Sequence, residues 1–148
     1  MPAEKDLSQA DYQVLAECRY QLRRFMHFSE QQAREAGLEP QQHQMLLAVR
    51  ALGSEKPASV GELAERMQLQ HHSTVELIDR MVERGLLERS RDTEDQRRVL
   101  IHLTPYGEEL LRKLSLAHRT ELRTTAPALL QALRALIENL DMDRDKEG

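Results

Sequence analysis

The chain has 148 residues, of which 40% are hydrophobic and 31% charged, and it contains one cysteine. These values are those of one soluble globular domain, and a single cysteine excludes an internal disulfide. No apolar run approaches the roughly 20 residues of a membrane span, and the N-terminal residues include no export segment, so we expect a cytoplasmic protein. The net charge of −4 also lacks the basic excess of many nucleic-acid-binding proteins.

Two helices are predicted in the first third of the chain. The first spans residues 11–36, and Gly37 is placed to end it. The second begins at Pro40 and ends before Gly53, and residues 54–58 are predicted to form a turn. The first helix has a wide apolar surface, which suggests burial on two sides, one of them against a second subunit. That surface consists of Val14, Leu15, Cys18, Leu22, Phe25, Met26, Phe28 and Ala33.

A short helix and a longer one are predicted next. Ser59 to Glu62 has the S-x-x-E form of a capping box, in which the serine hydroxyl meets the Glu62 amide and the carboxylate reaches back. Residues 68–70 are too few for anything but a turn. The longer helix ends at Gly85 and has its buried positions at i, i+3, i+4 and i+7, namely Thr74, Leu77, Ile78 and Met81. Its outward face carries His72, Val75, Glu76, Asp79, Arg80 and Glu83, with His71 and Ser73 on the first turn.

A β-hairpin is predicted after this helix. Residues 86–89 can form a short strand, and the polar residues 90–96 have the composition of a hairpin tip. From Arg97 onward the chain alternates, with Val99, Ile101 and Leu103 on one face and Arg98, Leu100 and His102 on the other.

Two more helices are predicted at the C-terminal end. Thr104 and Pro105 suit the N-cap and first position of a helix that runs to about Arg123. Residues 125–127, with Pro127, restart the chain in a last helix, and residues 141–148 are predicted to fray. Both helices carry more leucine than a monomer of this size needs, so we expect them to form a dimer interface together with the first helix.

A helix presented over a preceding helix, beside an arginine-bearing hairpin, is typical of small proteins that read double-stranded DNA. Residues 59–104 nevertheless contain seven arginines and nine acidic residues. Bulk attraction to phosphate will not suffice, so a few arginines must be placed accurately.

The segments ELAERM, LIDRMVERGLLER, Asp95-Gln96-Arg97 and LTPYG (residues 103–107), in this order and spacing, resemble those of the MarR family of bacterial winged-helix transcription regulators. The resemblance covers nearly the whole chain. It implies a mainly α fold with a small β-hairpin wing: one domain over residues 1–148, a winged helix-turn-helix region over 54–104, and dimerisation helices over 11–37 and 105–141. It also implies an obligate homodimer, with a recognition helix in the major groove and a wing in the minor groove. Many members are repressors released by a small, often aromatic, ligand.

Specific site residues follow from this resemblance. On the recognition helix they are Gln70, His71, His72, Ser73, Val75, Glu76 and Arg80, and on the wing Asp95, Arg97 and Arg98, where the aspartate orients Arg97. A ligand pocket between the first, second and fifth helices would be lined by Phe25, Met45, Val49 and Leu111. Glu76 departs from the neutral or basic residue of many relatives, and Glu39 from a threonine helix cap. No cofactor is implied.

We therefore expect a homodimeric repressor that binds a pseudo-palindromic operator, with the recognition helices about 34 Å apart, and that a ligand releases. Histidine gains charge as the pH falls towards ~6, so binding through His71 and His72 should strengthen there. If both histidine side chains only face solvent, DNA binding should not change with pH.

Other functions remain open. One is a dimeric interaction module without DNA binding. Another is a sensor of the same fold, either of peroxide through Cys18 or of a metal through His43, His118 and Glu121. No nucleophile elbow, P-loop or glycine-rich dinucleotide turn indicates an enzyme.

Overall fold

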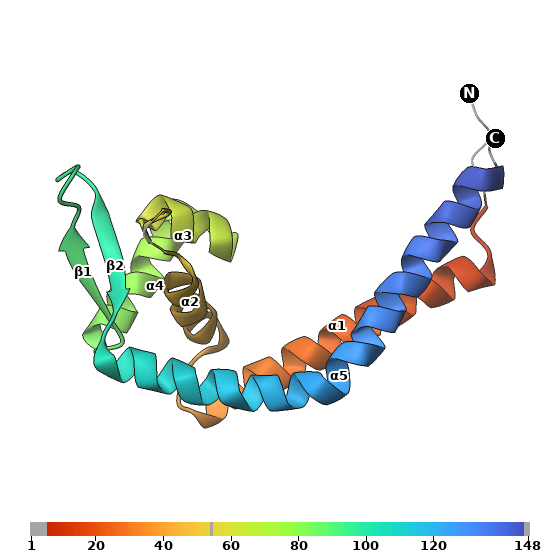
Figure 1. The fold of residues 1–148 in the computed structure, drawn as a ribbon, viewed down its shortest axis with the longest axis horizontal. Coiled ribbons are helices and arrows are strands. Elements are labelled where there is room, and N and C mark those ends of the chain that lie inside the picture. The colour runs from red at the N-terminus through yellow and green to blue at the C-terminus, as the bar shows by residue number, and fades with distance from the viewer. Residues whose placement is uncertain (1–5, 54, 147–148) are drawn as a thin grey trace. The chain divides into compact units, whose positions relative to one another are not determined.

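The computed structural model describes residues 6–53 and 55–146 (Figure 1). It is mainly helical with one two-stranded antiparallel hairpin, as predicted, and it forms two compact units. One unit contains residues 6–29 and 118–146, and the other contains residues 30–117. We call them the helical unit and the winged unit. No helix among the described residues is long and apolar enough to cross a membrane.

The first helix, α1 (Gln9–Glu35), begins two residues earlier than predicted. The cause is a reciprocal cap at its start. The Ser8 amide donates to a carboxylate oxygen of Asp11 at 2.7 Å, and the Asp11 amide donates to the Ser8 hydroxyl at 3.2 Å. Both bonds satisfy amides that lack partners in the first turn. As predicted, Gly37 follows the helix, with a φ of +79° that favours glycine.

The predicted break before Pro127 is wrong, because α5 (Pro105–Lys146) is one continuous helix with Pro127 inside it (Figure 1). A proline inside a helix costs about 3 kcal/mol. Within the helical unit, α1 contacts α5 on both sides of Pro127. The side-chain nitrogen of Asn139 donates to the Asp11 carboxylate at 2.8 Å, and the His118 ring bonds the Ser29 hydroxyl at 3.0 Å. The predicted fraying is also wrong for residues 141–146, which are helical, and residues 147–148 lie outside the described residues.

The winged unit contains α2 (Pro40–Ala51), α3 (Val60–Met67) and α4 (His71–Glu83). The Ser59 hydroxyl accepts from the Glu62 amide at 3.3 Å, which confirms half of the predicted capping box. The other half is wrong, because the Ser59 amide donates to the Pro57 carbonyl and the Glu62 carboxylate pairs with Arg66. Of the turn predicted between α2 and α3, Ser54 lies outside the described residues.

At the start of α2, the N-cap residue Glu39 and the N3 residue Gln42 form a capping box. The Gln42 side-chain oxygen accepts from the Glu39 amide at 3.1 Å. The same oxygen accepts from Arg84 at 2.8 Å, and a second Arg84 nitrogen donates to the Gly37 carbonyl at 2.8 Å. Arg84 therefore ties the end of α4 to the turn between α1 and α2.

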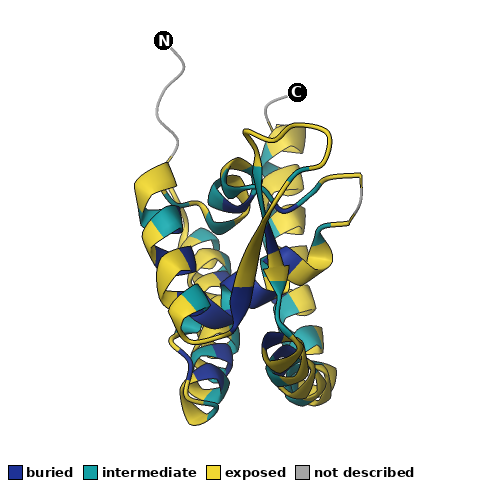
Figure 2. Cartoon of the chain, turned by 90° about the vertical axis from the view of Figure 1, so that its left-hand side faces the viewer, coloured by how far each residue is buried: buried dark blue, intermediate teal, exposed yellow. Residues whose placement is uncertain are grey.

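The hairpin consists of β1 (Leu87–Arg91) and β2 (Val99–Leu103), paired antiparallel with Leu87 opposite Leu103 and Arg91 opposite Val99. On its other edge, β2 bonds to the segment before α3, where the Ile101 amide donates to the Ala58 carbonyl at 2.9 Å. The buried residues lie at the base of the hairpin and its tip is exposed (Figure 2). The hairpin is thus anchored to the core at one end only.

One hydrophobic core fills the winged unit. As predicted, α4 contributes Thr74, Leu77, Ile78 and Met81, and all four are buried. They pack with fully buried side chains from the other elements of this unit, including Met45, Leu46, Leu63, Leu86, Leu87 and Ile101.

The LTPYG segment joins the hairpin to α5 by a close backbone approach. The Thr104 amide donates to the Leu86 carbonyl at 3.1 Å, and the Thr104 hydroxyl accepts from the Gly107 amide at 3.0 Å. Gly107 is buried, and a Cβ on it would lie 2.2 Å from the Leu86 oxygen. Only glycine fits there, which explains this residue of the motif.

Candidate nucleic-acid interface

The outward face of α4 presents the residues that the sequence predicted to contact DNA. His71, His72, Glu76 and Arg80 are exposed, and Ser73 and Val75 are half-buried. Gln70 is exposed but precedes the helix as its N-cap, and its carbonyl accepts from the Thr74 amide and hydroxyl at 3.0 and 2.9 Å. Among the described residues, no side chain pairs with the Arg80 guanidinium. This outward face of α4 is therefore free to meet another molecule.

An ion pair fixes α4 relative to the hairpin. Arg89 on β1 donates to the carboxylate of Asp79 on α4. Both residues lie beside the exposed α4 face, and both belong to the winged unit. The pair therefore bridges the helix and the strand, which already pack together in the core of this unit.

The tip of the hairpin, residues 92–98, is exposed except at the half-buried Asp92 and is ordered by hydrogen bonds. The Asp92 amide donates to the Arg98 carbonyl at 2.9 Å, and the Asp92 carboxylate accepts from the Glu94 amide at 3.0 Å. Arg91 donates across the loop to the Gln96 carbonyl at 2.8 Å. These bonds give the loop a defined shape although no apolar core supports it.

Asp95 acts mainly on the backbone of this loop. Its carboxylate accepts from the Arg97 amide at 3.1 Å, and its carbonyl accepts from the Arg98 amide at 2.9 Å. The Arg97 side chain lies farther away, with Nε 4.0 Å from the carboxylate, and 98% of that side chain is exposed. Asp95 thus sets the direction in which Arg97 leaves the loop, while the guanidinium itself points into solvent.

The structure also accounts for several of the acidic residues. Three arginine–acid pairs, Arg66 with Glu62, Arg89 with Asp79, and Arg98 with Asp92, neutralise part of the negative charge. The most exposed positive group of the hairpin tip is then that of Arg97. An anion approaching the hairpin end-on meets this side chain first.

Residues 36–98 match the family model described as MarR family. They contain α2, α3, α4, β1 and the hairpin tip, which are the elements that build the surface described above. Over these residues the chain is similar to the MarR family. It is also 40% identical over 65 residues to YsmB, an uncharacterized HTH-type transcriptional regulator of Bacillus subtilis (strain 168). That alignment covers 44% of this chain and 44% of YsmB.

Solved MarR-type structures share the fold over most of their length. AbsC, a MarR family transcriptional regulator from Streptomyces coelicolor, matches with a TM-score of 0.74 at 20% identity, over 96% of this chain and 97% of AbsC. A point mutant of MepR from S. aureus, bound to an oligodeoxyribonucleotide, matches with a TM-score of 0.63 at 17% identity, over 97% of this chain and 100% of MepR. BpsR of Bordetella bronchiseptica matches with a TM-score of 0.62 at 24% identity, over 83% of this chain and 89% of BpsR. Its structure concerns the regulation of DNA binding by 6-hydroxynicotinic acid. These likenesses show the winged-helix fold.

The ligand pocket predicted from the MarR resemblance is not assembled within either unit. Met45, Val49 and Leu111 are buried in the core of the winged unit, and Phe25 belongs to the helical unit. The pocket stays a prediction.

The residues that suggested a sensor have structural neighbours. Cys18 is a buried free cysteine on α1. His118 packs edge-on against Phe28, with ring centroids 5.5 Å apart, and bonds Ser29. The described residues contain no group of three or more His, Cys, Asp or Glu side chains that could hold a metal ion.

Sequence reasoning missed three residues that shape the surface of α4 and the hairpin, namely Asp79 with Arg89, and Asp92. Asp92 precedes a polar loop, and an aspartate there commonly bonds the amide two residues on, so turn chemistry could have identified it. The pairing of Asp79 with Arg89 had no such signal, because it crosses from a helix to a strand.

Proposed function

We propose that this chain is a sequence-specific DNA-binding transcription regulator that inserts α4 into the major groove and the hairpin tip into the adjacent minor groove. The observation that carries the proposal is that an unpacked polar helix face and an ordered, arginine-bearing hairpin are fixed in one unit by the Asp79–Arg89 pair. A helix in the major groove can read base edges, and an arginine suits the narrow minor groove. A MepR mutant of the same fold is bound to an oligodeoxyribonucleotide, which supports DNA binding by this chain.

The proposed base contacts come from the first turns of α4. His71, His72 and Ser73 can donate to or accept from base edges there. Val75 offers an apolar surface that suits the thymine methyl group. Glu76 is exposed on the same face and would accept from a cytosine amino group. Gln70 and Arg80 flank these positions and are placed for phosphate or further base contacts.

We also propose that the active form is a homodimer. In the helical unit, α1 and α5 expose large apolar side chains that an isolated chain would leave in water: Tyr12, Leu15, Tyr20, Leu22 and Met26 on α1, and Leu130, Leu133, Ile137, Leu140 and Met142 on α5. Exposed apolar surface on this scale commonly marks a protein interface. A twofold dimer would present two α4 helices to successive major-groove segments, about 34 Å apart, on a pseudo-palindromic operator.

A small effector would release such a dimer from DNA by favouring a different separation of the two winged units. A shift from almost fully bound to almost fully released requires a preference of about 5.5 kcal/mol for the released state. The regulation of BpsR by 6-hydroxynicotinic acid supports release by a small aromatic ligand in this fold. With operators overlapping promoters, the outcome would be repression.

Selection of DNA sites from a pool of random duplexes tests the proposal. Repeated rounds should enrich one pseudo-palindromic sequence, and affinity for it should fall steeply as salt rises, because phosphate contacts release counterions. A scrambled duplex of equal length is the matched control. An interaction module without DNA binding would enrich no sequence and show only weak retention of either duplex, and that result would exclude the proposal.

A further inference from the structure

The charges of the helical unit are divided between its two ends. The two hydrogen bonds between α1 and α5, one towards each end of the unit, show that the helices run antiparallel. One end therefore contains residues 6–17 and 135–146, with seven acidic and two basic residues. The other contains residues 18–29 and 118–134, with six arginines and one glutamate. We call them the acidic end and the basic end.

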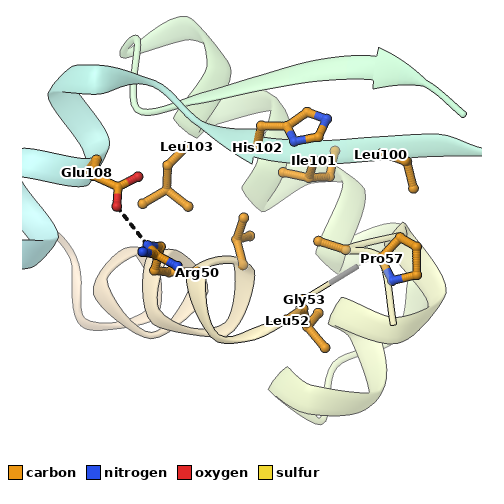
Figure 3. Close-up of a pocket in the computed structure, with 11 residues that line it drawn as sticks. Arg50, Leu52, Gly53, Pro57, Leu100, Ile101, His102, Leu103 and Glu108 are labelled. Atoms are coloured by element: carbon orange, nitrogen blue, oxygen red, sulfur yellow. Dashed lines mark hydrogen bonds and ion pairs between the residues drawn. The ribbon is translucent and has the colours of Figure 1, made fainter. Parts of the chain in front are cut away.

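Charged side chains at both ends of this unit have no partner within the chain. In the winged unit, by contrast, arginines are often paired, as where Arg50 on α2 donates to Glu108 on α5 at 2.7 Å (Figure 3). Among the described residues, no oppositely charged side chain pairs with several exposed residues on the helical-unit part of α5, which include Arg119, Arg123, Asp141 and Asp145. These groups are therefore available to charges on another molecule.

The four charges lie on the face of α5 that also exposes its large apolar side chains. Residues three, four or seven positions apart share one face of a helix. Leu130 follows Arg123 by seven residues, and Ile137 follows Leu130 by seven and precedes Asp141 by four. The other arginine and the other aspartate lie one turn farther out along the same face. The exposed apolar side chains are thus bounded by a basic pair on one side and an acidic pair on the other.

We propose that two copies of the chain pair antiparallel along this face, with the basic end of each copy against the acidic end of the other. Position 132 lies midway between Arg119 and Asp145, and also midway between Arg123 and Asp141. A twofold axis beside this position therefore places each of the two arginines opposite an aspartate of the second copy. Because a twofold interface repeats every contact, both junctions join opposite charges.

The same arrangement covers the apolar part of the face. Leu130 and Leu133 are exposed and flank position 132, so the leucines of the two copies meet near the axis. Apolar contacts stabilise many pairings, whereas the charges select the partner and its direction. A parallel pair, or a chain without this division of charges, brings like charges together. The inference rests on the proposed homodimer and adds the feature by which the chain selects a second copy of itself.

Sedimentation of two charge-reversed variants of the full chain tests the inference. In Arg119→Glu/Arg123→Glu all four positions are acidic, and in Asp141→Lys/Asp145→Lys all four are basic. The dimer dissociation constant of each variant alone should rise about a hundredfold, because like charges then meet at both junctions. An equimolar mixture should form a mixed dimer with about wild-type affinity, because both junctions again join opposite charges.

The matched control is Arg112→Glu/Lys113→Glu, which makes the same change of charge at exposed positions of α5 in the winged unit. It should leave the dissociation constant unchanged. Recovery in the mixture also shows that both reversed variants are folded. If either loses the helical circular dichroism of the wild type, the milder pair Arg123→Glu and Asp141→Lys takes their place in the same test.

The outcomes separate this inference from the proposed homodimer. A wild-type chain that stays monomeric at micromolar concentrations would contradict both. A dimeric wild type contradicts the charge pairing alone if the reversed variants dimerise as tightly as the wild type, or if they are monomeric and their mixture does not dimerise.

Discussion

The two units of this chain bury their side chains to very different degrees. In the winged unit, long apolar side chains such as Met45, Leu77 and Ile101 are completely enclosed. In the described part of the helical unit, the buried residues are Cys18, Gln21, Ser29 and Ala132, which are small or polar. Many of the large apolar side chains of that unit, including Ile137 and Leu140, are exposed instead.

This difference indicates that the units have different requirements for stability. Burial of apolar area stabilises a fold by roughly 25 cal/mol per Å², so the winged unit has the core of an independent domain. The helical unit would gain the equivalent stabilisation only when a second copy covers α1 and α5. Under the proposed function, DNA reading rests on the winged unit and dimerisation on the helical unit. A substitution on the surface of the helical unit should then change both the oligomeric state and operator binding, whereas one in the winged unit should leave the oligomeric state unchanged.

The largest effect is expected at the surface of the helical unit. Ile137→Glu places a charge on an exposed apolar position, which should convert the dimer to a monomer and weaken operator binding about a hundredfold or more, because the second binding event is then no longer linked to the first. Sedimentation and operator titration measure both. Leu47→Glu is the control, since Leu47 is similarly exposed, at 45% against 58%, but lies on α2 of the winged unit. A dimeric Ile137→Glu protein would contradict the assignment.

A large effect is also expected where the winged unit is most tightly closed. In Gly107→Ala the new methyl group would collide with the Leu86 carbonyl, so the free energy of unfolding should fall by about 2 kcal/mol or more. Gly61→Ala is the matched substitution in α3, where nothing lies within 4 Å of the new Cβ. It should be neutral or stabilising by about 0.5–1 kcal/mol. Urea denaturation of both variants measures the difference, and equal stabilities would show that the close approach is not required.

Arg97→Ala should act on the function of the winged unit without affecting its core. Loss of the exposed guanidinium should lower operator affinity about tenfold and leave the melting temperature unchanged. Anisotropy titration and thermal unfolding give the two values. Arg112→Ala removes an exposed arginine elsewhere and should change neither. Wild-type affinity in Arg97→Ala would remove this residue from the mechanism.

The smallest effect is expected at the Glu109–Arg112 pair on the surface of α5. Arg112 donates two hydrogen bonds, at 2.8 and 3.0 Å, which together with its charge lower the pKa of Glu109. Any stabilisation by this pair is therefore present at pH values above the ordinary pKa of glutamate. It is lost as the pH falls through the lowered pKa of Glu109. Arg112→Gln should raise the pKa of Glu109 back towards the ordinary value in an NMR titration, with no measurable change in unfolding. An unchanged pKa would exclude Arg112 as the cause.

The sequence predicted the winged unit more accurately than the helical unit. Periodicity placed Thr74, Leu77, Ile78 and Met81 in the core, and the glycines and the serine cap marked the element ends, because each of these signals is local. Pro127 misled the prediction for the opposite reason. By local rules a proline ends a helix, but here the helix continues on both sides of it. The helix contacts α1, which is distant in the sequence, and no local pattern predicts such contacts.

The candidate site shows the same limit. The exposed face of α4 followed from helical spacing, and the wing followed from alternation and from the family motif. The pairing of Asp79 with Arg89 joins two elements, and the backbone role of Asp95 depends on loop geometry. Neither could be predicted from residue types alone.

The most direct test of the central claim is a change of spacing within the selected operator. If two winged units are held apart by one pair of helical units, inserting five base pairs between the half-sites rotates one of them by about half a helical turn. We predict that this insertion lowers affinity about a hundredfold. Affinity should recover when the insertion is lengthened to ten base pairs, if the dimer can still reach both half-sites. Affinity that does not change with the five-base-pair insertion would contradict the account, because it would mean that each winged unit binds DNA alone.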